Sequence, residues 1–263
     1  MGPEALAAQA RSGLAAVRLT LLHLYPDLLD IYGDRGNVLA LRQRAAWRGL
    51  DLACREASVG EALDFESIDL LCIGGGEDAK QALAAEDLGG RAPQLRAAVE
   101  AGLPVLAVCG GYQLLGDHYQ PAGAERLPGA GVLDAHTVAG DGRLIGNVVA
   151  DSAEFGTLVG FENHSGRTWL GPGCRPLGRV RPGRGGGNNG RDGGEGALHH
   201  HCVGTYLHGA VLPKNPRLAD FLLGAAVQRR HGARAAEALP ALDDALEQAA
   251  HRAAEALGRE GRR

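Results

Sequence analysis

The chain has 263 residues, of which 45% are hydrophobic and 22% charged, and its formal net charge is −4. These values are typical of a globular protein with a full hydrophobic core, and the interspersed charges exclude the clustered Lys/Arg stripe that nucleic-acid binding requires. No apolar run reaches about 18 residues, and no basic segment precedes an apolar one near the N-terminus, so we expect a cytoplasmic protein without a membrane span.

Short apolar runs alternate with helical segments through the first half of the chain. Runs rich in Leu, Val and Ile, too short for helices, predict buried strands at residues 17–24, 50–54, 69–73 and 104–108. Helical spacing of apolar residues predicts helices over 38–47 and 92–101. This order predicts an α/β fold with a mostly parallel sheet flanked by helices, in which functional loops lie at the carboxyl ends of the strands.

The second half of the chain adds β-type runs at residues 131–138, 144–150 and 202–207, with a polar loop at 160–168. The segment 183–196, rich in Gly, Asn and Asp, predicts a solvated loop, because no Gly-Lys-Ser/Thr follows it to form a phosphate cradle. From Asn215 to about Gly258 the pattern is Ala-rich and helical. We expect the far end of this tail to be poorly ordered.

Cys109 stands between a predicted strand and two glycines. A sharp strand-to-helix turn of this kind is a nucleophile elbow, which pushes the side chain out at the edge of the sheet. The alternative is an ordinary buried thiol. That is what we expect for most of the other cysteines, which form no C-x-x-C pair: Cys54, Cys72, Cys174 and Cys202. The position of Cys109 favours a nucleophile.

A second glycine group, Gly74-Gly75-Gly76, directly follows the predicted strand at 69–73. It could form a tight turn or a weak nucleotide loop. We favour an oxyanion role, since attack on an amide carbon creates an oxyanion that needs backbone N–H donors. The backbone of Gly75 or Gly76, together with that of Gly110, would supply these donors.

A cysteine that attacks an amide also needs a base that later protonates the departing ammonia. Among ten histidines, His208 in Tyr-Leu-His-Gly again ends an apolar strand, so we predict that it is this base. The run 199–201 is His-His-His and resembles a metal site. In a strand, however, only His199 and His201 would share a face, and two ligands hold a metal poorly, so we predict no metal site there.

Three segments together resemble the class I glutamine amidotransferases of the cobyric acid synthase type: Val-Cys-Gly-Gly-Tyr-Gln around Cys109, Gly-Gly-Gly at 74–76 and Tyr-Leu-His-Gly at 206–209. Longer segments at 28–37, 160–168 and 204–216 resemble the glutaminase subunits of lipid II isoglutaminyl synthases. The resemblance runs from about Leu19 to Leu223. It implies a flavodoxin-like amidotransferase domain over 17–231, an N-terminal extension over 1–16 and an Ala-rich helical tail over 232–263.

The same resemblance implies the reaction. L-glutamine would be hydrolysed by this chain, and ammonia would pass to a Mur-ligase-like partner subunit that amidates the D-glutamate of lipid II to D-isoglutamine. ATP and Mg²⁺ are expected in the partner, and no cofactor is expected in this chain.

By matching position, the resemblance implies that Cys109 and His208 form the catalytic pair and that Arg143 contacts glutamine, whose carboxylate suits a bidentate guanidinium. An ordinary surface arginine is the alternative for Arg143. The other residues expected at the substrate pocket are Gln113, Gly75, Gly76, Gly110, Asn163, His164, Ser165 and Gly166.

One position departs from the class I pattern. These enzymes usually carry Glu two residues after the catalytic His, where this chain has Ala210. Without a carboxylate to orient His208, the isolated subunit would be a weak glutaminase. The sequence does not choose among the possible substitutes, which are Asp27, Asp30, Asp34 and Glu162.

Two other functions stay open at this point. A stand-alone Cys-His γ-glutamyl hydrolase would need no partner, and a catalytically silent docking subunit would bind a ligase-like protein while Cys109 resisted alkylation. Cobyric acid synthase itself is disfavoured, because that family places a nucleotide-binding domain ahead of the amidotransferase and only residues 1–16 precede the first predicted strand.

Overall fold

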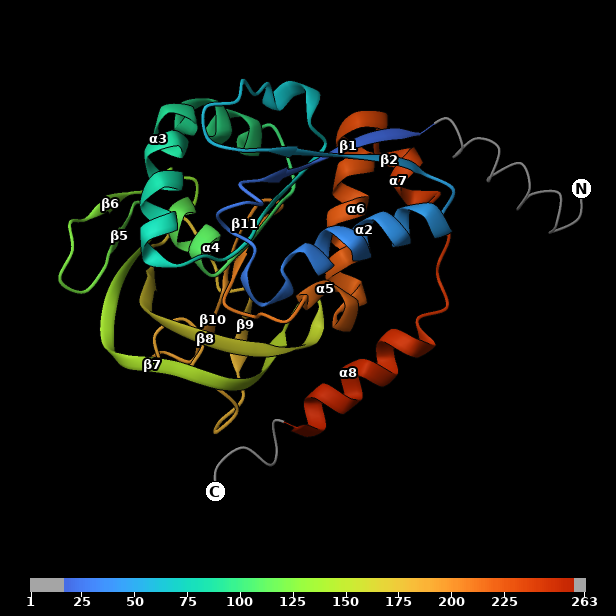
Figure 1. Cartoon of the computed structure of the whole chain (residues 1–263). Helices are drawn as coiled ribbons and strands as arrows, with labels where there is room; N and C mark the ends of the chain where they lie inside the picture. Colours follow the sequence, from blue (N-terminus) through green and yellow to red (C-terminus); the bar gives the residue numbers. More distant parts are fainter. Residues whose placement is uncertain (1–16, 258–263) are drawn as a thin grey trace, which may run out of the picture.

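Two β-sheets and the helices around them make up residues 17–257, the part of the chain that the computed structural model describes (Figure 1). The expected N-terminal extension, 1–16, and the end of the chain after residue 257 lie outside the described residues. No helix in the described part is long and apolar enough to cross a membrane.

The first sheet has six strands in the order β11-β12-β4-β3-β1-β2, and every neighbouring pair is parallel except β11 with β12. The strands are β1 (Arg18–Leu24), β2 (Asp51–Ala57), β3 (Leu70–Ile73), β4 (Val105–Val108), β11 (Ala197–His199) and β12 (Cys202–Thr205). All residues of the central strands β3, β4 and β12 are buried, as expected for parallel strands covered on both faces. The predicted α/β fold is confirmed.

Helices flank this sheet, and the largest are α2 (Arg35–Trp47), α3 (Asp78–Glu100) and α6 (Pro216–His231). The shorter ones are η1 (Ile31–Gly33), η2 (Phe65–Ser67), α4 (Gly110–Leu115) and α5 (Val211–Lys214). Helix α2 packs against α6, and α3 packs against α4; the two pairs lie on opposite sides of the strands in Figure 1. Right-handed crossovers that leave β1 and β3 in opposite directions produce this arrangement. The crevice between β1 and β3 is therefore a topological switch point, where α/β proteins bind ligands.

Helix α3 begins at Asp78, much earlier than the predicted start at residue 92. The helix continues through Gly89-Gly90 and Pro93, although glycine and proline disfavour a helix interior. Ala84, Ala85 and Leu88 are buried against the core. This packing outweighs the weak helix propensity of the two glycines.

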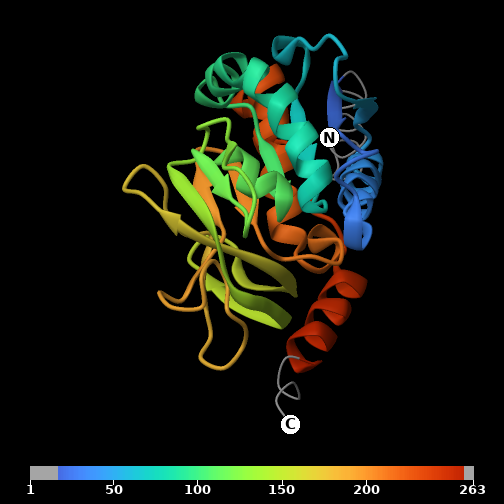
Figure 2. The same ribbon diagram turned by 60° about the vertical axis from the view of Figure 1, so that its left-hand side comes forward.

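The second sheet has the order β10-β9-β7-β5-β6, with β8 paired to β7. Its strands are β5 (His118–Gln120), β6 (Leu127–Pro128), β7 (Ala135–Ser152), β8 (Gly156–Leu170), β9 (Gly178–Val180) and β10 (Gly194–Glu195). The long β7–β8 hairpin crosses the lower part of the molecule in Figures 1 and 2. Most β elements of the second half of the chain thus build a sheet of their own, whereas the run expected at 202–207 supplies β12 of the first sheet.

Two details predicted for this half are wrong. The runs 131–138 and 144–150 do not form separate strands, because β7 is continuous and only its register with β8 shifts, between Ala139 and Leu144. Residues 160–168, expected as a polar loop, lie within β8. Buried polar residues of β8 have partners in the fold; Glu162, for example, accepts hydrogen bonds from the N–H groups of Gly186 and Gly187. Polarity alone could not reveal such partners.

The segment 183–196 is likewise not the solvated loop that its composition predicts. Asn188, Asn189 and Glu195 are buried. The Asn188 amide donates to the carbonyl of Gly196 at 2.8 Å, and that of Asn189 donates to the carbonyl of Thr168 at 3.0 Å. These side chains satisfy backbone groups that would otherwise need water, so the segment packs against β8.

The Ala-rich helical region predicted from Asn215 onward contains, in its described part up to Leu257, the helices α6, α7 (Ala233–Glu237) and α8 (Ala245–Leu257). Arg44 of α2, whose side chain is buried, links α2 to two parts of this region. Its guanidinium lies 2.8 Å from Asp220 in α6 and 2.6 Å from Asp244 just before α8. The two carboxylates neutralise a cation that burial alone would penalise, and they attach the start of α8 to α2.

Candidate active site

Cys109 occupies a strained turn between β4 and α4. Its φ of 49° and ψ of −103° are unusual for a residue with a side chain. The turn is held by Cys109 N–H, which donates to Thr205 O at 2.8 Å, and by Gly111 N–H, which donates to Gly74 O at 3.0 Å. A Cβ at Gly111 would lie 2.7 Å from a methyl carbon of Ile73, so only glycine permits this approach. The predicted elbow is present.

His208 follows β12 and is fully buried. Its backbone N–H donates to Phe161 O at 2.7 Å, which ties it to β8. Gly75 lies between His208 and the cysteine, since a Cβ placed on it would be 3.1 Å from Cys109 Cβ and 3.2 Å from His208 Cε1. The structure therefore brings the two predicted catalytic side chains together.

Asp34 is the carboxylate that faces His208. Its Oδ1 lies 3.6 Å from His208 Nδ1, and its Oδ2 accepts a 2.7 Å hydrogen bond from Gly75 N–H. Burial acts to lower the pKa of His208, but Asp34 and Cys109 outweigh it and raise that pKa to about 9. The other three suggested carboxylates have different contacts: Asp27 with Ser58, Asp30 with Arg35 N–H, and Glu162 with Gly186 and Gly187.

The glycines of the expected oxyanion site differ in whether their N–H groups are available to an oxyanion. Gly75 N–H is bonded to Asp34, so it is not available to an oxyanion. Gly76 N lies 3.1 Å from the position that a Cβ on Gly110 would occupy, so these two backbone segments approach closely. Gly76 and Gly110 are therefore the donor pair that the geometry favours.

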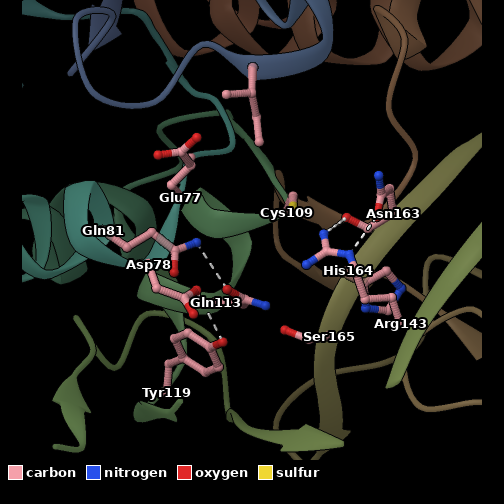
Figure 3. Close-up of a pocket in the computed structure, with 12 residues that line it drawn as sticks. Glu77, Asp78, Gln81, Cys109, Gln113, Tyr119, Arg143, Asn163, His164 and Ser165 are labelled. Atoms are coloured by element: carbon pink, nitrogen blue, oxygen red, sulfur yellow. Dashed lines mark hydrogen bonds between the residues drawn. The ribbon is translucent and has the colours of Figure 1, made fainter. Parts of the chain in front are cut away.

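A cavity of about 570 Å³ opens beside the elbow. Predicted site residues line it from both sheets: Gly76, Cys109, Gln113, Arg143, Asn163, His164 and Ser165 (Figure 3). The remaining predicted residues, Gly75, Gly110, Gly166 and His208, are not on its lining. Further lining residues that the sequence had not indicated are Ile31, Glu77, Asp78, Gln81 and Tyr119.

Opposite charges flank this cavity (Figure 3). Glu77 and Asp78 lie at the start of α3, and the Asp78 carboxylate accepts a 3.3 Å hydrogen bond from the Tyr119 hydroxyl. Arg143 lies across the cavity, where its Nε donates to Asn163 Oδ1 at 2.7 Å and its Nη2 to Asn163 O at 2.9 Å. The arrangement suits an amino-acid zwitterion. In the sequence, Glu77 and Asp78 directly follow the glycine triplet 74–76, and this position could have indicated that they lie at the site.

Gln113 belongs to a chain of buried hydrogen bonds along the wall of the cavity. Its amide oxygen accepts from Gln81 Nε2 at 3.0 Å, and its Nε2 donates to the Tyr206 hydroxyl at 3.1 Å. The Tyr206 hydroxyl is also 2.7 Å from Thr168 Oγ1. With both ends of its amide engaged, Gln113 shapes the pocket.

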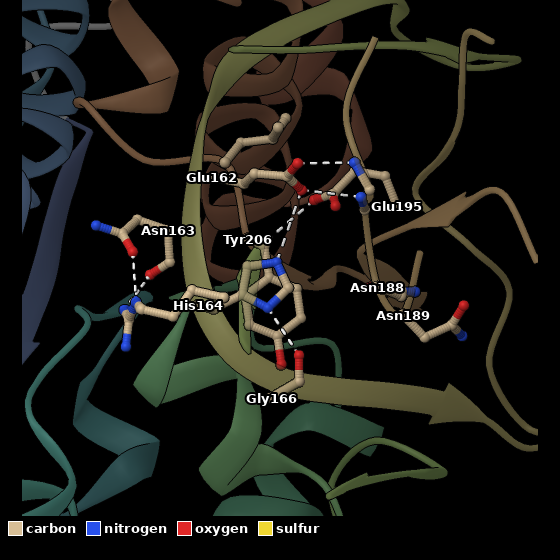
Figure 4. Close-up of polar contacts among 12 residues, drawn as sticks. Glu162, Asn163, His164, Gly166, Asn188, Asn189, Glu195 and Tyr206 are labelled. Atoms are coloured by element: carbon tan, nitrogen blue, oxygen red, sulfur yellow. Dashed lines mark hydrogen bonds and ion pairs between the residues drawn. The ribbon is translucent and has the colours of Figure 1, made fainter. Parts of the chain in front are cut away.

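His164 is fixed by contacts on three sides (Figure 4). Its ring stacks on Tyr206 with centroids 3.5 Å apart, and Nδ1 donates to Gly166 O at 2.8 Å. Its Nε2 lies 3.7 Å from Glu162 Oε2. Burial lowers the pKa of His164 despite this carboxylate, so the neutral ring serves as a rigid wall.

Glu195 supports the segment that leads to His208. Its Oε1 accepts from the Thr205 hydroxyl at 2.6 Å and from Tyr206 N–H at 3.0 Å. Complete burial raises its pKa to about 7. Because Glu195 lies in a segment of low complexity, no local pattern could have indicated this role.

The histidine run does not behave as a strand throughout, so the expected pairing of His199 with His201 is wrong. Strand β11 ends at His199, and His200 has a φ of 50° in the turn that follows. As a result, His199 and His200 both face Glu100, whereas His201 packs against Phe221.

The chain matches known proteins along most of its length. A family model described as the CobB/CobQ-like glutamine amidotransferase domain matches residues 20–216. A protein of Staphylococcus aureus (strain N315), named lipid II isoglutaminyl synthase (glutamine-hydrolyzing) subunit GatD, is 44% identical over 212 residues, covering 81% of this chain and 86% of the relative. The protein of the same name from Streptococcus pneumoniae (strain ATCC BAA-255 / R6) is 35% identical over 241 residues, 91% of each chain.

Similarity in three dimensions extends beyond these relatives. A solved structure of a glutamine amidotransferase superimposes on the chain with a TM-score of 0.55 at 20% identity. The match covers 78% of this chain and 98% of the solved one. At this level of identity the likeness concerns the fold alone.

Proposed function

The chain belongs to the CobB/CobQ-like glutamine amidotransferase family, and from this membership we propose that it hydrolyses L-glutamine through a thioester on Cys109. The observation that carries the proposal is the convergence of Cys109, His208 and Asp34 around Gly75. A nucleophile, a base and a carboxylate that orients the base are the parts that covalent amide hydrolysis needs.

In the first half-reaction, His208 takes the thiol proton and the sulfur of Cys109 attacks the side-chain amide carbon of glutamine. The N–H groups of Gly76 and Gly110 stabilise the oxyanion that develops. When the tetrahedral intermediate collapses, the carbon–nitrogen bond breaks, His208 returns its proton to the departing nitrogen, and ammonia leaves. The product on the protein is a glutamyl thioester.

In the second half-reaction, His208 removes a proton from a water molecule that attacks the thioester carbon. The carbon–sulfur bond breaks, the thiol regains its proton, and glutamate is released. Asp34 acts through His208 in both halves, because it holds Nδ1 and stabilises the imidazolium.

Substrate recognition follows from the charges across the cavity. Arg143 binds the α-carboxylate of glutamine, and its orientation is set by Asn163. Asp78, held by Tyr119, binds the α-ammonium group. With the backbone of glutamine held between Arg143 and Asp78, its side-chain amide points toward Cys109. Gln113, together with His164 and Ser165 of β8, forms the wall of the cavity.

Ammonia from this reaction is passed to a partner subunit, a Mur-ligase-like protein of the MurT type, which uses ATP and Mg²⁺ to amidate the D-glutamate of lipid II. Support comes from the names of the two relatives, which are subunits of lipid II isoglutaminyl synthase. No cofactor is required in this chain for the thioester chemistry, and we place the reaction in the cytoplasm, where glutamine and ATP are available.

Two measurements test the proposal. The purified chain, with and without its partner, should release ammonia and glutamate in equal amounts from glutamine, and Cys109→Ser should abolish both products. Capture of the tagged chain from its native cell extract should recover a Mur-ligase-like protein. A chain that hydrolyses γ-glutamyl peptides and captures no ligase would instead be a stand-alone hydrolase.

A further inference from the structure

A cluster of two imidazoles and one carboxylate lies far from the active site. His199 ends β11, His200 begins the two-residue turn to β12, and Glu100 ends α3. His199 Nε2 lies 2.9 Å from Glu100 Oε1, and His200 Nε2 lies 3.2 Å from Glu100 Oε2. The three ligand atoms are all within 4.8 Å of one another.

The backbone of the turn creates this convergence. His200 adopts the left-handed region, with a φ of 50°, which side chains other than glycine enter at a cost. This turn brings the His200 ring against that of His199, with centroids 4.3 Å apart. The strand alternation that would separate neighbouring side chains does not apply here.

The hydrogen bond on the other side of the His199 ring decides which nitrogen faces Glu100 with a lone pair. Nδ1 of His199 lies 3.1 Å from the carbonyl of Gly173, which can only accept, so Nδ1 carries the hydrogen. In the neutral ring, Nε2 is then an acceptor 2.9 Å from a carboxylate oxygen. Two acceptors at that distance repel each other, and a cation bound between them would remove the repulsion.

We propose that Glu100, His199 and His200 bind a divalent transition metal, Zn²⁺ foremost. Imidazole and carboxylate are ordinary ligands of Zn²⁺ at about 2.0–2.2 Å, which separates tetrahedral ligand atoms by roughly 3.3–3.6 Å. The observed separations are 2.9 Å and 3.2 Å, one to each oxygen of Glu100, and all three ligand atoms lie within 4.8 Å of one another, so the cluster is close to this range. A backbone carbonyl that receives the second ring N–H is also the usual companion of a metal-bound histidine. Water would complete the fourth position.

The place of the site in the fold indicates a structural role. Strand β12 runs from the metal site toward His208, and α3 runs from Asp78 at the cavity to Glu100. The 23 residues of α3 place the two sites on the order of 30 Å apart. A metal there joins the end of α3 to the edge hairpin β11–β12 and takes no part in glutamine hydrolysis.

The test uses the full, untagged chain, stripped of metal with a chelator and titrated with ZnCl₂ against a chromophoric zinc indicator near neutral pH. We expect one equivalent of Zn²⁺ to bind and to raise the melting temperature. Glu100→Gln, His199→Gln and His200→Gln should each weaken binding at least about tenfold.

His201→Gln is the matched control, because His201 belongs to the same run but packs on Phe221. This variant should bind Zn²⁺ within about threefold of the wild type, a difference under roughly 0.7 kcal/mol. Melting curves establish that each variant is folded. Absence of saturable binding, unchanged binding in Glu100→Gln, or an equal loss in folded His201→Gln would each overturn the proposal.

Discussion

Asp34 and His208, 174 positions apart in the chain, meet with Oδ1 of the carboxylate 3.6 Å from Nδ1 of the ring. Both side chains are buried, and Gly75 N–H holds the other carboxylate oxygen. Class I amidotransferases usually place this carboxylate two residues after the histidine. Here Ala210 occupies that position, and the loop after β1 supplies the acid from the other side of the site.

Asp34→Asn should lower kcat for glutamine by on the order of 10²- to 10⁴-fold, because an amide neither fixes the required tautomer nor stabilises the imidazolium. KM should change little, since Asp34 does not line the cavity. Steady-state ammonia release measures both constants. Asp27→Asn, a change in the same loop at an exposed carboxylate bonded to Ser58, is the matched control; an equal loss there would remove the special role of Asp34.

The same variant should change how stability depends on pH. His208 has its pKa raised from 6.5 to about 9 in the folded protein, so its stabilising contribution is complete below about pH 6.5 and is lost as the pH rises through about 9. In Asp34→Asn this loss between pH 6.5 and 9 should become smaller. Urea unfolding across that range measures the effect, and identical pH profiles for both proteins would show that Asp34 does not act on His208.

Cys109 should react with an electrophilic glutamine analogue ahead of the other four cysteines. Burial raises the pKa of the Cys72 and Cys202 thiols, and Cys54 is the exposed competitor. Iodoacetamide, which does not resemble glutamine, provides the control because it should also modify the exposed Cys54. Peptide mass spectrometry locates each adduct. Analogue labelling that glutamine does not suppress, or that centres on Cys54, would contradict the nucleophile assignment.

A site residue can be predicted from the sequence when its neighbours along the chain reveal its position, and it cannot when only long-range contacts do. Cys109 and His208 each end an apolar strand beside glycine, and a strand-end position can be recognised from a few neighbouring residues. Asp34 could only be named among four carboxylates, because its contact with His208 exists solely through the parallel order of β1, β3, β4 and β12. Long-range packing, and not local pattern, selects it.

Buried polar residues account for two of the errors. Residues 160–168 and 183–196 look like loops because they are polar or rich in glycine. Glu162 is nevertheless buried and accepts from Gly186 N–H, and buried Asn188 accepts from the Tyr112 hydroxyl, so each has a partner in a distant segment. Composition indicates that burying a polar side chain is unfavourable on average. It does not identify the hydrogen-bond partners that make burial of a particular side chain possible. The predicted pairing of His199 with His201 is wrong for another reason. The left-handed turn at His200 interrupts the strand, and such a turn at histidine has no clear local signal in the sequence.

Recognition of the α-carboxylate of glutamine can be distinguished from recognition of its α-ammonium group by using a substrate that lacks the ammonium group. Arg143→Ala and Asp78→Asn should each raise KM for glutamine about tenfold or more, as a lost charge-assisted contact of roughly 1.5–3 kcal/mol predicts. Glutaramic acid, which has the same amide and carboxylate but no amino group, should be hydrolysed equally by wild type and Asp78→Asn, while Arg143→Ala should still impair it. Equal impairment of both substrates by Asp78→Asn would mean that Asp78 does not bind the ammonium group.

Glutamine hydrolysis and amide formation should be separable in the assembled complex, because Cys109 is needed only to generate ammonia, whereas the ATP-dependent step belongs to the partner. With Cys109→Ala, glutamine-supported amidation of lipid II should fall by several orders of magnitude, as expected when a covalent nucleophile is removed. His208→Ala should behave alike. Amidation is followed by mass spectrometry of the lipid II product.

Concentrated ammonium at mildly alkaline pH should restore amidation in both variants, since free NH₃ can then reach the activated acceptor without being produced by this chain. Gel filtration provides the control, because neither side chain is proposed to hold the interface and both complexes should remain assembled. Cys54→Ala, a change at an exposed thiol on the edge strand β2, should leave glutamine-supported amidation intact. If ammonium fails to rescue an assembled Cys109→Ala complex, Cys109 must do more than release ammonia, and the division of chemistry between the two subunits would have to be abandoned.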